Sequence, residues 1–354
     1  MKTKQKTYKI GKVIDLFCGI GGLTHGFLKE GFDVVAGIDN DDTCRYGYES
    51  NNKAKFIHKA IEDVDAKEIK QLYGDPSDIS VLVGCAPCQP YSKLNTSGAS
   101  EEDFGPIMKF AELISKVKPD IVSMENVRGV AKYPVFKKFL ANLDKNGYEY
   151  DYKIVNTADY GVPQRRMRLV LLASRLGPIK LLEQTHDKNN WVTVHDAIGD
   201  LEIIKDGEIS NTDLLHRSRK LSHLNKKRIK ATPKDGGNSK SWDKKLLLDC
   251  HKKTSGKTYR STVYGRMRWD EPAPTMTTQC TGLGNGRFGH PEQDRAISLR
   301  EAAMFQTFPK NYKFYDNKSP YVVSDVARFI GNAVPVKLGQ VIAKSIKRHL
   351  MEVK

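Results

Sequence analysis

The stretch KVIDLFCGIGGLTHGFLKEGFDVVAGIDN (residues 12–40) contains an apolar segment, a run of glycines, a helical segment and a second apolar segment. Leu23, Phe27 and Leu28 recur at a spacing that places them on one face of a helix, and Gly31 ends that helix. KVIDLF before the glycines and DVVAGIDN after the helix are both typical of short buried strands. This order of strand, turn, helix and strand predicts the start of a parallel sheet covered by helices.

The same alternation continues to about residue 175. Further strands are predicted at ISVLVG (79–84), DIVSMENV (120–127) and MRLVLLAS (167–174), and KFIHKAIEDV (55–64) can hold one more. Helices are predicted at PIMKFAELISKVKP (106–119) and FKKFLANLDKNG (136–147). From about 190 to 290 the rhythm is lost, and the sequence becomes charged, glycine-rich and irregular. The sequence therefore predicts an α/β fold with a doubly wound, mostly parallel sheet, followed by a smaller, irregular domain.

The composition is that of a soluble globular protein. The chain has 354 residues, of which 39% are hydrophobic, and it contains no apolar run long enough to span a membrane. Its N-terminus, MKTKQKTYKIGK, is polar and basic with no apolar segment behind it. The six cysteines form no regular framework, which favours reduced thiols. We therefore expect a cytoplasmic protein with no membrane partner.

The charge distribution points to a polyanionic partner. Lys and Arg number 58 against 42 Asp and Glu, a net charge of +16. Residues 216–260 hold 15 Lys and Arg against three acidic residues, so +12 lies in this one segment. A charge run is often only a solvated surface, but neutralising phosphates with release of counterions is the role that such a concentration suits best. We expect nucleic acid as the partner, with phosphate contacts from Lys226, Lys227, Arg228 and Lys230.

The glycine turn DLFCGIGG (15–22) indicates a nucleoside cofactor. Its glycines allow the backbone to turn tightly and to approach a ligand at the N-terminus of the following helix. Asp39 ends the next strand, where a carboxylate can accept hydrogen bonds from ribose hydroxyls. The glycine spacing differs from G-x-G-x-x-G, which favours a nucleoside without a pyrophosphate.

The stretch GCAPCQPYS (84–92) places two cysteines directly after a predicted strand. A zinc site would need further ligands, and the chain has no second C-x-x-C or H-x-x-x-H, so we expect no metal. A redox pair would more usually open a helix than precede a loop rich in Pro and Ser. The remaining interpretation is that Cys88, beyond Pro87, is a nucleophile and that Cys85, next to the strand, is a small packing residue.

Two later stretches can assist such a nucleophile. In MENVRGV, Glu125 ends a predicted strand and can face the same edge of the sheet. In VPQRRMR, Gln164, Arg166 and Arg168 alternate, so we expect them on one side of an extended segment. For Glu125 the alternative is a helix cap or a solvated loop carboxylate, and for the arginines it is a surface ion pair.

Together these stretches resemble the C5-cytosine DNA methyltransferase family. In chain order the sequence has DLFCGIGG, GCAPCQPYS, MENVRGV, VPQRRMR, RAISLREAAMFQTFP (295–309) and RFIGNAVPV (328–336), which look like six of that family's motifs. They cover the chain except for its basic middle. Cys18, Cys85, Tyr91 and Phe305 stand where the family more often has other small or apolar residues, which puts only local packing in doubt.

The resemblance implies a methyltransferase dependent on S-adenosylmethionine that adds Cys88 to carbon 6 of a cytosine flipped out of duplex DNA and methylates carbon 5. Glu125 would hold ring nitrogen 3, and the other catalytic residues would be Gln164, Arg166 and Arg168. The cofactor would contact Asp15, Phe17, Gly19, Ile20, Gly21, Gly22, Asp39, Asn40, Asp63, Val64, Pro87, Asn332 and Val334. An RNA cytosine-5 methyltransferase of the same fold and a non-catalytic DNA-binding relative remain as alternatives.

The resemblance also assigns the domains and partners. It implies a catalytic and cofactor-binding domain over 1–190, a target-recognition domain and hinge over 191–319, and a segment over 320–354 that returns to the catalytic domain. Double-stranded DNA would be the substrate. We expect a monomer that functions beside a cognate restriction nuclease acting separately.

Overall fold

The computed structural model describes residues 10–87, 105–249, 263–316 and 321–353. The chain divides into two compact units. The sheet unit consists of Met1–Asn156, Met167–Glu183 and Val336–Lys354, and the irregular unit of Thr157–Arg166 and Gln184–Pro335. The boundaries at 183 and 335 differ from the expected 190 and 319. In addition, a ten-residue excursion, Thr157–Arg166, belongs to the irregular unit although sequence patterns place it within the first domain.

The sheet unit contains seven strands in the order β3-β2-β1-β4-β5-β7-β6. Their bounds are Lys12–Leu16 (β1), Asp33–Asp39 (β2), Lys55–His58 (β3), Ser80–Gly84 (β4), Ile121–Val127 (β5), Glu149–Asn156 (β6) and Met167–Ser174 (β7). Strands β1 to β5 pair in parallel, whereas β7 runs antiparallel between β5 and β6. The predicted doubly wound, mostly parallel sheet is therefore confirmed.

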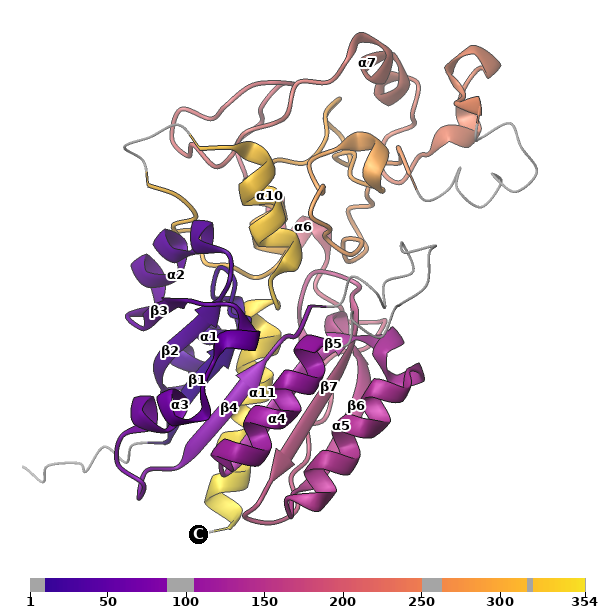
Figure 1. Cartoon of the computed structure of the whole chain (residues 1–354). Helices are drawn as coiled ribbons and strands as arrows, with labels where there is room; N and C mark the ends of the chain where they lie inside the picture. The colour runs from indigo at the N-terminus through magenta and orange to yellow at the C-terminus, as the bar shows by residue number, and fades with distance from the viewer. Residues whose placement is uncertain (1–9, 88–104, 250–262, 317–320, 354) are drawn as a thin grey trace, which may run out of the picture. The chain divides into compact units, whose positions relative to one another are not determined.

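Helices cover both faces of this sheet. Their bounds are Gly22–Lys29 (α1), Arg45–Asn52 (α2), Ala66–Tyr73 (α3), Gly105–Val117 (α4), Pro134–Lys145 (α5) and Val336–Glu352 (α11). Helices α3, α4 and α5 pack in a row, with α4 and α5 in front of the sheet in Figure 1 and α11 behind it. Helices α1 and α11 cross with their backbones in contact at Gly26 and Gly339. A Cβ atom added to Gly26 would lie only 2.6 Å from the carbonyl carbon of Gly339, so there is no room for a side chain. The C-terminal helix α11 thus returns to the sheet unit.

The parallel strands determine where ligand-binding residues gather. Because β1, β2, β4 and β5 run in the same direction, the residues that follow Leu16, Ile38, Gly84 and Met124 emerge at one edge of the sheet. An apolar core packs between the strands and the helices α3, α4 and α5. Buried residues such as Val13, Val81 and Val83 line the other face, so the strands are held rigid on both sides. Asp39 and Glu125 lie at this edge, as the sequence predicts.

The irregular unit has few regular elements among its described residues. They are α6 (Val194–Ile198), α7 (His223–Lys230), α9 (Leu299–Phe305), α10 (Val323–Asn332) and short 3₁₀ turns. Buried polar side chains replace much of the missing backbone pairing. Arg266, which is fully buried, donates to the carbonyl oxygens of Ile229, Thr232 and His290 at 2.8 to 3.0 Å.

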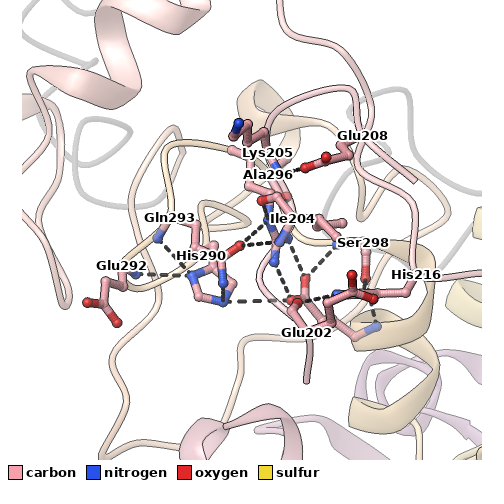
Figure 2. Close-up of polar contacts among 12 residues, drawn as sticks. Glu202, Ile204, Lys205, Glu208, His216, His290, Glu292, Gln293, Ala296 and Ser298 are labelled. Carbon is pink, nitrogen blue, oxygen red and sulfur yellow. Dashed lines mark hydrogen bonds and ion pairs between the residues drawn. The ribbon is translucent and has the colours of Figure 1, made fainter. Parts of the chain in front are cut away.

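A second buried network surrounds the N-terminus of α9. Figure 2 shows Glu202, His216 and Ser298 close together: the ring nitrogens of His216 lie 2.8 Å from the carbonyl oxygen of Glu202 and 2.9 Å from the hydroxyl of Ser298. Arg295 donates two bonds, of 2.8 and 2.7 Å, to Glu301. Burial opposes the charge of Glu301, but Arg295 outweighs it and lowers the pKa of this carboxyl to about 2. The stretch RAISLRE therefore stabilises the irregular unit with an internal ion pair.

Candidate active site

The glycine turn after β1 is clamped by a carboxylate from β2. Phe17, Gly19 and Gly21 all have positive φ angles, of 61°, 50° and 89°, so the backbone turns sharply here. Asp39 accepts a 2.8 Å hydrogen bond from the Gly19 N–H on one oxygen and a 2.9 Å bond from the Asp41 N–H on the other. A left-handed angle at Phe17, which is costly for a residue with a side chain, indicates that the turn serves a ligand.

The space beside this turn suits a nucleoside with a carboxylate or similar anionic group. Helix α1 starts directly after Gly21 without a side-chain cap and without an acidic residue in its first turn. Its first N–H groups and the positive end of its dipole are therefore directed at any ligand placed there. A Cβ built at Gly19 would meet no atom of the described residues within 4 Å. The turn thus offers both open space and hydrogen-bond donors.

Asp15 lies beneath the turn and faces the interior. It is about 1% exposed and accepts a 2.7 Å bond from the hydroxyl of Thr24, which also lies 3.1 Å from the hydroxyl of Tyr48. Burial, with a smaller contribution from the charge of Asp39, raises the pKa of Asp15 to about 7. The family resemblance names Asp15 as a cofactor contact, whereas in the structure its carboxyl group is buried against Thr24. Sequence patterns miss Thr24 and Tyr48, because their contact depends on how α1 and α2 pack on the sheet.

The raised pKa of Asp15 predicts a pH-dependent stability. The folded protein keeps the Asp15 proton up to about pH 7, whereas an unfolded Asp loses it near pH 4, so this residue's stabilising contribution is lost as pH rises through that window. Between pH 5 and pH 8, the unfolding free energy of the native chain should therefore fall by about 2 kcal/mol more than that of Asp15→Asn. Urea titrations at the two pH values measure this difference. A constant difference between the two proteins would show that Asp15 does not hold its proton.

The other expected cofactor residues of the sheet unit lie around the same edge. Ile20, Gly21, Gly22 and Val64 are buried, whereas Asn40, Asp63 and Pro87 are exposed. Asp63 ends the 3₁₀ turn Ile61–Asp63 that follows β3. Asn332, the last residue of α10, and Val334 belong to the irregular unit.

Glu125 lies in the centre of the sheet edge. It is about 2% exposed, and its Oε1 lies 2.9 Å from Nε of Arg168 on the neighbouring strand β7. The guanidinium does not direct an N–H at Oε1, so this buried oxygen accepts no hydrogen bond from the described residues. A buried carboxylate oxygen without a donor is costly, and such groups are typical of functional sites.

The segment that leads to Cys88 contacts Glu125 and its neighbour. The thiol of Cys85 donates a 2.8 Å hydrogen bond to Oε2 of Glu125, and Asn126 donates a 3.2 Å bond to the carbonyl oxygen of Ala86. The expectation that Cys85 is a small packing residue does not include this contact of its thiol with a carboxylate. Cys88 itself lies outside the described residues, two positions beyond Ala86.

Gln164 and Arg166 are both buried in the irregular unit. Arg166 donates to the carbonyl oxygens of Met276 and Gly331 at 2.8 and 3.0 Å. Gln164 donates to the side chain of Gln306 at 2.8 Å and accepts a 2.8 Å bond from the Met276 N–H. The two side chains thus join the VPQRRMR stretch to distant parts of the irregular unit, while Arg168 pairs with Glu125 in the sheet unit.

The basic helix α7 differs from its expected role at one position. Lys227 and Lys230 are exposed, and Lys226 pairs with Asp206 at 2.9 Å. Arg228 is buried, with its guanidinium 5.6 Å from the ring of Trp242 and 5.1 Å from that of Tyr264. The expectation that Arg228 contacts phosphate is wrong, because the aromatic rings and its 3.0 Å bond to the Leu246 carbonyl hold it inside the unit.

Two kinds of feature are absent from the described ranges. No group of three or more His, Cys, Asp or Glu side chains in them could hold a metal ion. None of their helices is long and apolar enough to cross a membrane.

Comparison with known proteins gives consistent matches along the chain. Residues 11–348 match the family model of the C-5 cytosine-specific DNA methylases. The Type II methylase M.HgiDII of Herpetosiphon aurantiacus is 49% identical over 344 residues, covering 96% of both chains. The Type II methyltransferase M.MthTI of Methanothermobacter thermautotrophicus is 29% identical, covering 96% of this chain and 97% of its own.

A solved structure also shares the fold. It belongs to a protein described as a prophage-encoded DNA modification methyltransferase (E. coli), which aligns with a TM-score of 0.72 at 22% identity. The alignment covers 96% of this chain and 99% of that one.

Proposed function

Because the chain belongs to the C-5 cytosine-specific DNA methylase family, we propose that it methylates a cytosine flipped out of a specific duplex DNA sequence, through a covalent bond to Cys88. The membership makes it a DNA methyltransferase acting on carbon 5 of cytosine. The mechanism rests on one observation above the others: the buried, hydrogen-bond-deficient Oε1 of Glu125 beside the segment that leads to Cys88.

Cytosine needs activation before it can be methylated. Carbon 5 is a weak nucleophile, but a thiolate that bonds to carbon 6 breaks the C5=C6 double bond and leaves an enamine with its double bond between carbons 4 and 5, whose nucleophilic atom is carbon 5. We assign this attack to Cys88. Once carbon 5 carries the methyl group, its proton leaves to a base or to water, the C5=C6 double bond forms again and the sulfur–carbon 6 bond breaks. Nitrogen 3 returns its proton to Glu125, and Cys88 is restored as the free thiolate.

Glu125 supports the attack by neutralising the negative charge that develops on the ring. As the sulfur adds to carbon 6, electron density moves to ring nitrogen 3, which a carboxylic acid can protonate. Oε1 is the oxygen available for this role, because Cys85 already occupies Oε2. The carboxylate that remains after proton transfer is stabilised by Arg168, whose Nε lies 2.9 Å away.

The cofactor assigned to this family is S-adenosylmethionine, which supplies the methyl group when bound. The glycine turn fits it: the uncapped N-terminus of α1 and the open space at Gly19 suit its carboxylate, and Asp39 and Asp63 suit its ribose and adenine. Arg166 and Gln164 would act by organising the irregular unit, since each makes hydrogen bonds to its backbone or side chains.

We assign DNA backbone binding to the exposed lysines of α7. Lys227→Gln combined with Lys230→Gln should weaken duplex binding irrespective of sequence and flatten the slope of log K against log salt by about two units, because each phosphate contact contributes about 0.9. Lys137→Gln with Lys138→Gln on α5, also exposed, removes the same charge and should leave the slope unchanged. Fluorescence anisotropy at several salt concentrations measures these slopes. If the α7 double variant kept the same slope as the α5 double variant, the lysines of α7 would belong to a solvated surface that does not contact DNA.

Bisulfite sequencing of DNA from cells that express the chain tests the proposed function. Protection of cytosine at one recurrent sequence is the expected result. Methylation of transfer RNA but not of duplex DNA by the purified protein would favour the RNA alternative, and no methylation of either would favour a non-catalytic binder.

The relatives' names suggest the biological setting. Both M.HgiDII and M.MthTI are described as Type II enzymes. We propose that this chain likewise modifies the DNA sites of a Type II restriction system, as a monomer, and that a separate nuclease cleaves the unmodified sites. DNA from expressing cells should then resist one restriction nuclease that cleaves the same sequence.

A further inference from the structure

We propose that Cys85 is a positioning residue for the reaction: its thiol holds Oε2 of Glu125 and thereby leaves Oε1 as the oxygen that meets the base. This inference rests on the proposed role of Glu125 as the acid. It concerns a residue that sequence patterns treat as packing and that neither bonds to the base nor transfers a proton in the proposed chemistry. The contact between Sγ and Oε2, 2.8 Å long, is the observation that carries it.

The position of Cys85 is fixed by three neighbouring strands. Strands β4 and β5 pair in parallel with Gly84 beside Met124, so the next residues, Cys85 and Glu125, lie side by side. The backbone N–H of Cys85 donates a 3.3 Å bond to the carbonyl oxygen of Leu16 at the end of β1. Together with the bond from Asn126 to Ala86, these contacts fix the backbone from which the thiol reaches Glu125.

The two oxygens of Glu125 therefore have different surroundings. Oε2 accepts the S–H of Cys85, whereas Oε1 accepts no hydrogen bond from the described residues and has only the ionic contact with Arg168. A carboxylic acid whose Oε2 already accepts a hydrogen bond carries its proton on the other oxygen. After the proton passes to the base, the S–H and the guanidinium each stabilise one oxygen of the carboxylate.

A packing role and a positioning role predict different results. If Cys85 only fills space, alanine should serve nearly as well. If it positions Glu125, alanine leaves Oε2 without a donor in a buried site, and the carboxyl group can rotate or bind in the wrong orientation. Cys85→Ala should then slow single-turnover methyl transfer about 10-fold at saturating duplex DNA and S-adenosylmethionine, with duplex binding changed less than twofold.

Cys85→Ser supplies the matched rescue. A serine hydroxyl is smaller than a thiol but donates a hydrogen bond from the same position, so this variant should keep its rate within about threefold of the native chain. Cys280→Ala removes a thiol of the irregular unit, a buried one, and should leave the rate unchanged. Equal losses in the Ala and Ser variants would overturn the inference.

A double-mutant cycle separates the inference from the function on which it rests. In a Glu125→Ala background the thiol has no carboxylate to hold, so adding Cys85→Ala should change the single-turnover rate less than twofold. A further 10-fold loss in that background would show that Cys85 acts without Glu125, and the inference would fail alone. A native rate in the single variant Glu125→Ala would instead remove the acid role of Glu125, and with it both proposals.

Discussion

Cys88→Ser is expected to abolish covalent attack on the target cytosine and to lower the methyl-transfer rate on the order of 10⁴-fold or more, because an enzyme that loses its nucleophile loses most of its rate enhancement. A hydroxyl with a pKa far above neutral supplies almost no anion, whereas a thiol with an ordinary pKa of about 8.5 is already a few per cent ionised at neutral pH. Duplex binding should persist in the variant.

A duplex with 5-fluorocytosine at the target position gives the sharpest measurement. Fluorine at carbon 5 cannot leave as a proton does, so the elimination that frees the sulfur fails and the adduct persists. The native chain and Cys85→Ala should both form this adduct in the presence of S-adenosylmethionine, the latter more slowly, and Cys88→Ser should form none. Peptide mapping that located the adduct on Cys85, or full activity in Cys88→Ser, would overturn the mechanism.

The central strands could be predicted from sequence because burial on both sides leaves a plain signal. In β4 and β5 nearly every residue is buried, so their apolar runs stand out from the flanking turns. Strand β6, Glu149–Asn156, was not predicted. It lies at the edge of the sheet, and its residues EYDYKI alternate charged and apolar side chains without forming the continuous apolar run by which the central strands are recognised. Two of its apolar residues, Tyr152 and Ile154, are exposed.

The candidate site was predicted in its parts but not in its contacts. That Asp39 and Glu125 lie at one edge follows from the local pattern, because Asp39 ends β2 and Glu125 lies two residues before the end of β5, which runs parallel to its neighbour β4. The pairing of Glu125 with Arg168 requires β7 to insert between β5 and β6, an arrangement of strands distant in sequence. The bond from Cys85 depends in the same way on the register of β4 against β5.

Arg228 shows why a charge run alone does not identify a binding surface. In sequence it is one of four basic residues in five positions, and nothing nearby distinguishes it from Lys227 or Lys230. In the structure it neighbours Ile229 on the buried side of α7, where Trp242 and Tyr264 enclose its guanidinium. Because those aromatic residues come from later segments, only the tertiary structure separates the buried cation from the exposed ones.

Glu125→Gln is expected to lower the single-turnover methyl-transfer rate by roughly 10²-fold to 10⁴-fold, the range typical of lost acid-base help. Glutamine has nearly the shape of glutamate and keeps an N–H that can donate to ring nitrogen 3, so the flipped base can still be held. It cannot give up a proton, however, and the charge that the attack of Cys88 sends to the ring is then left without neutralisation. Binding of the unmodified duplex should be nearly unaffected.

The control for the change of charge is Glu112→Gln on α4. Glu112 is partly exposed and pairs with Lys116 at its own helix surface, so its replacement removes one negative charge from the same unit without touching the sheet edge. The rate of Glu112→Gln should equal that of the native chain. If Glu125→Gln also methylated at the native rate, the buried oxygen beside Arg168 would have no part in proton transfer, and the acid would have to be sought elsewhere at the sheet edge.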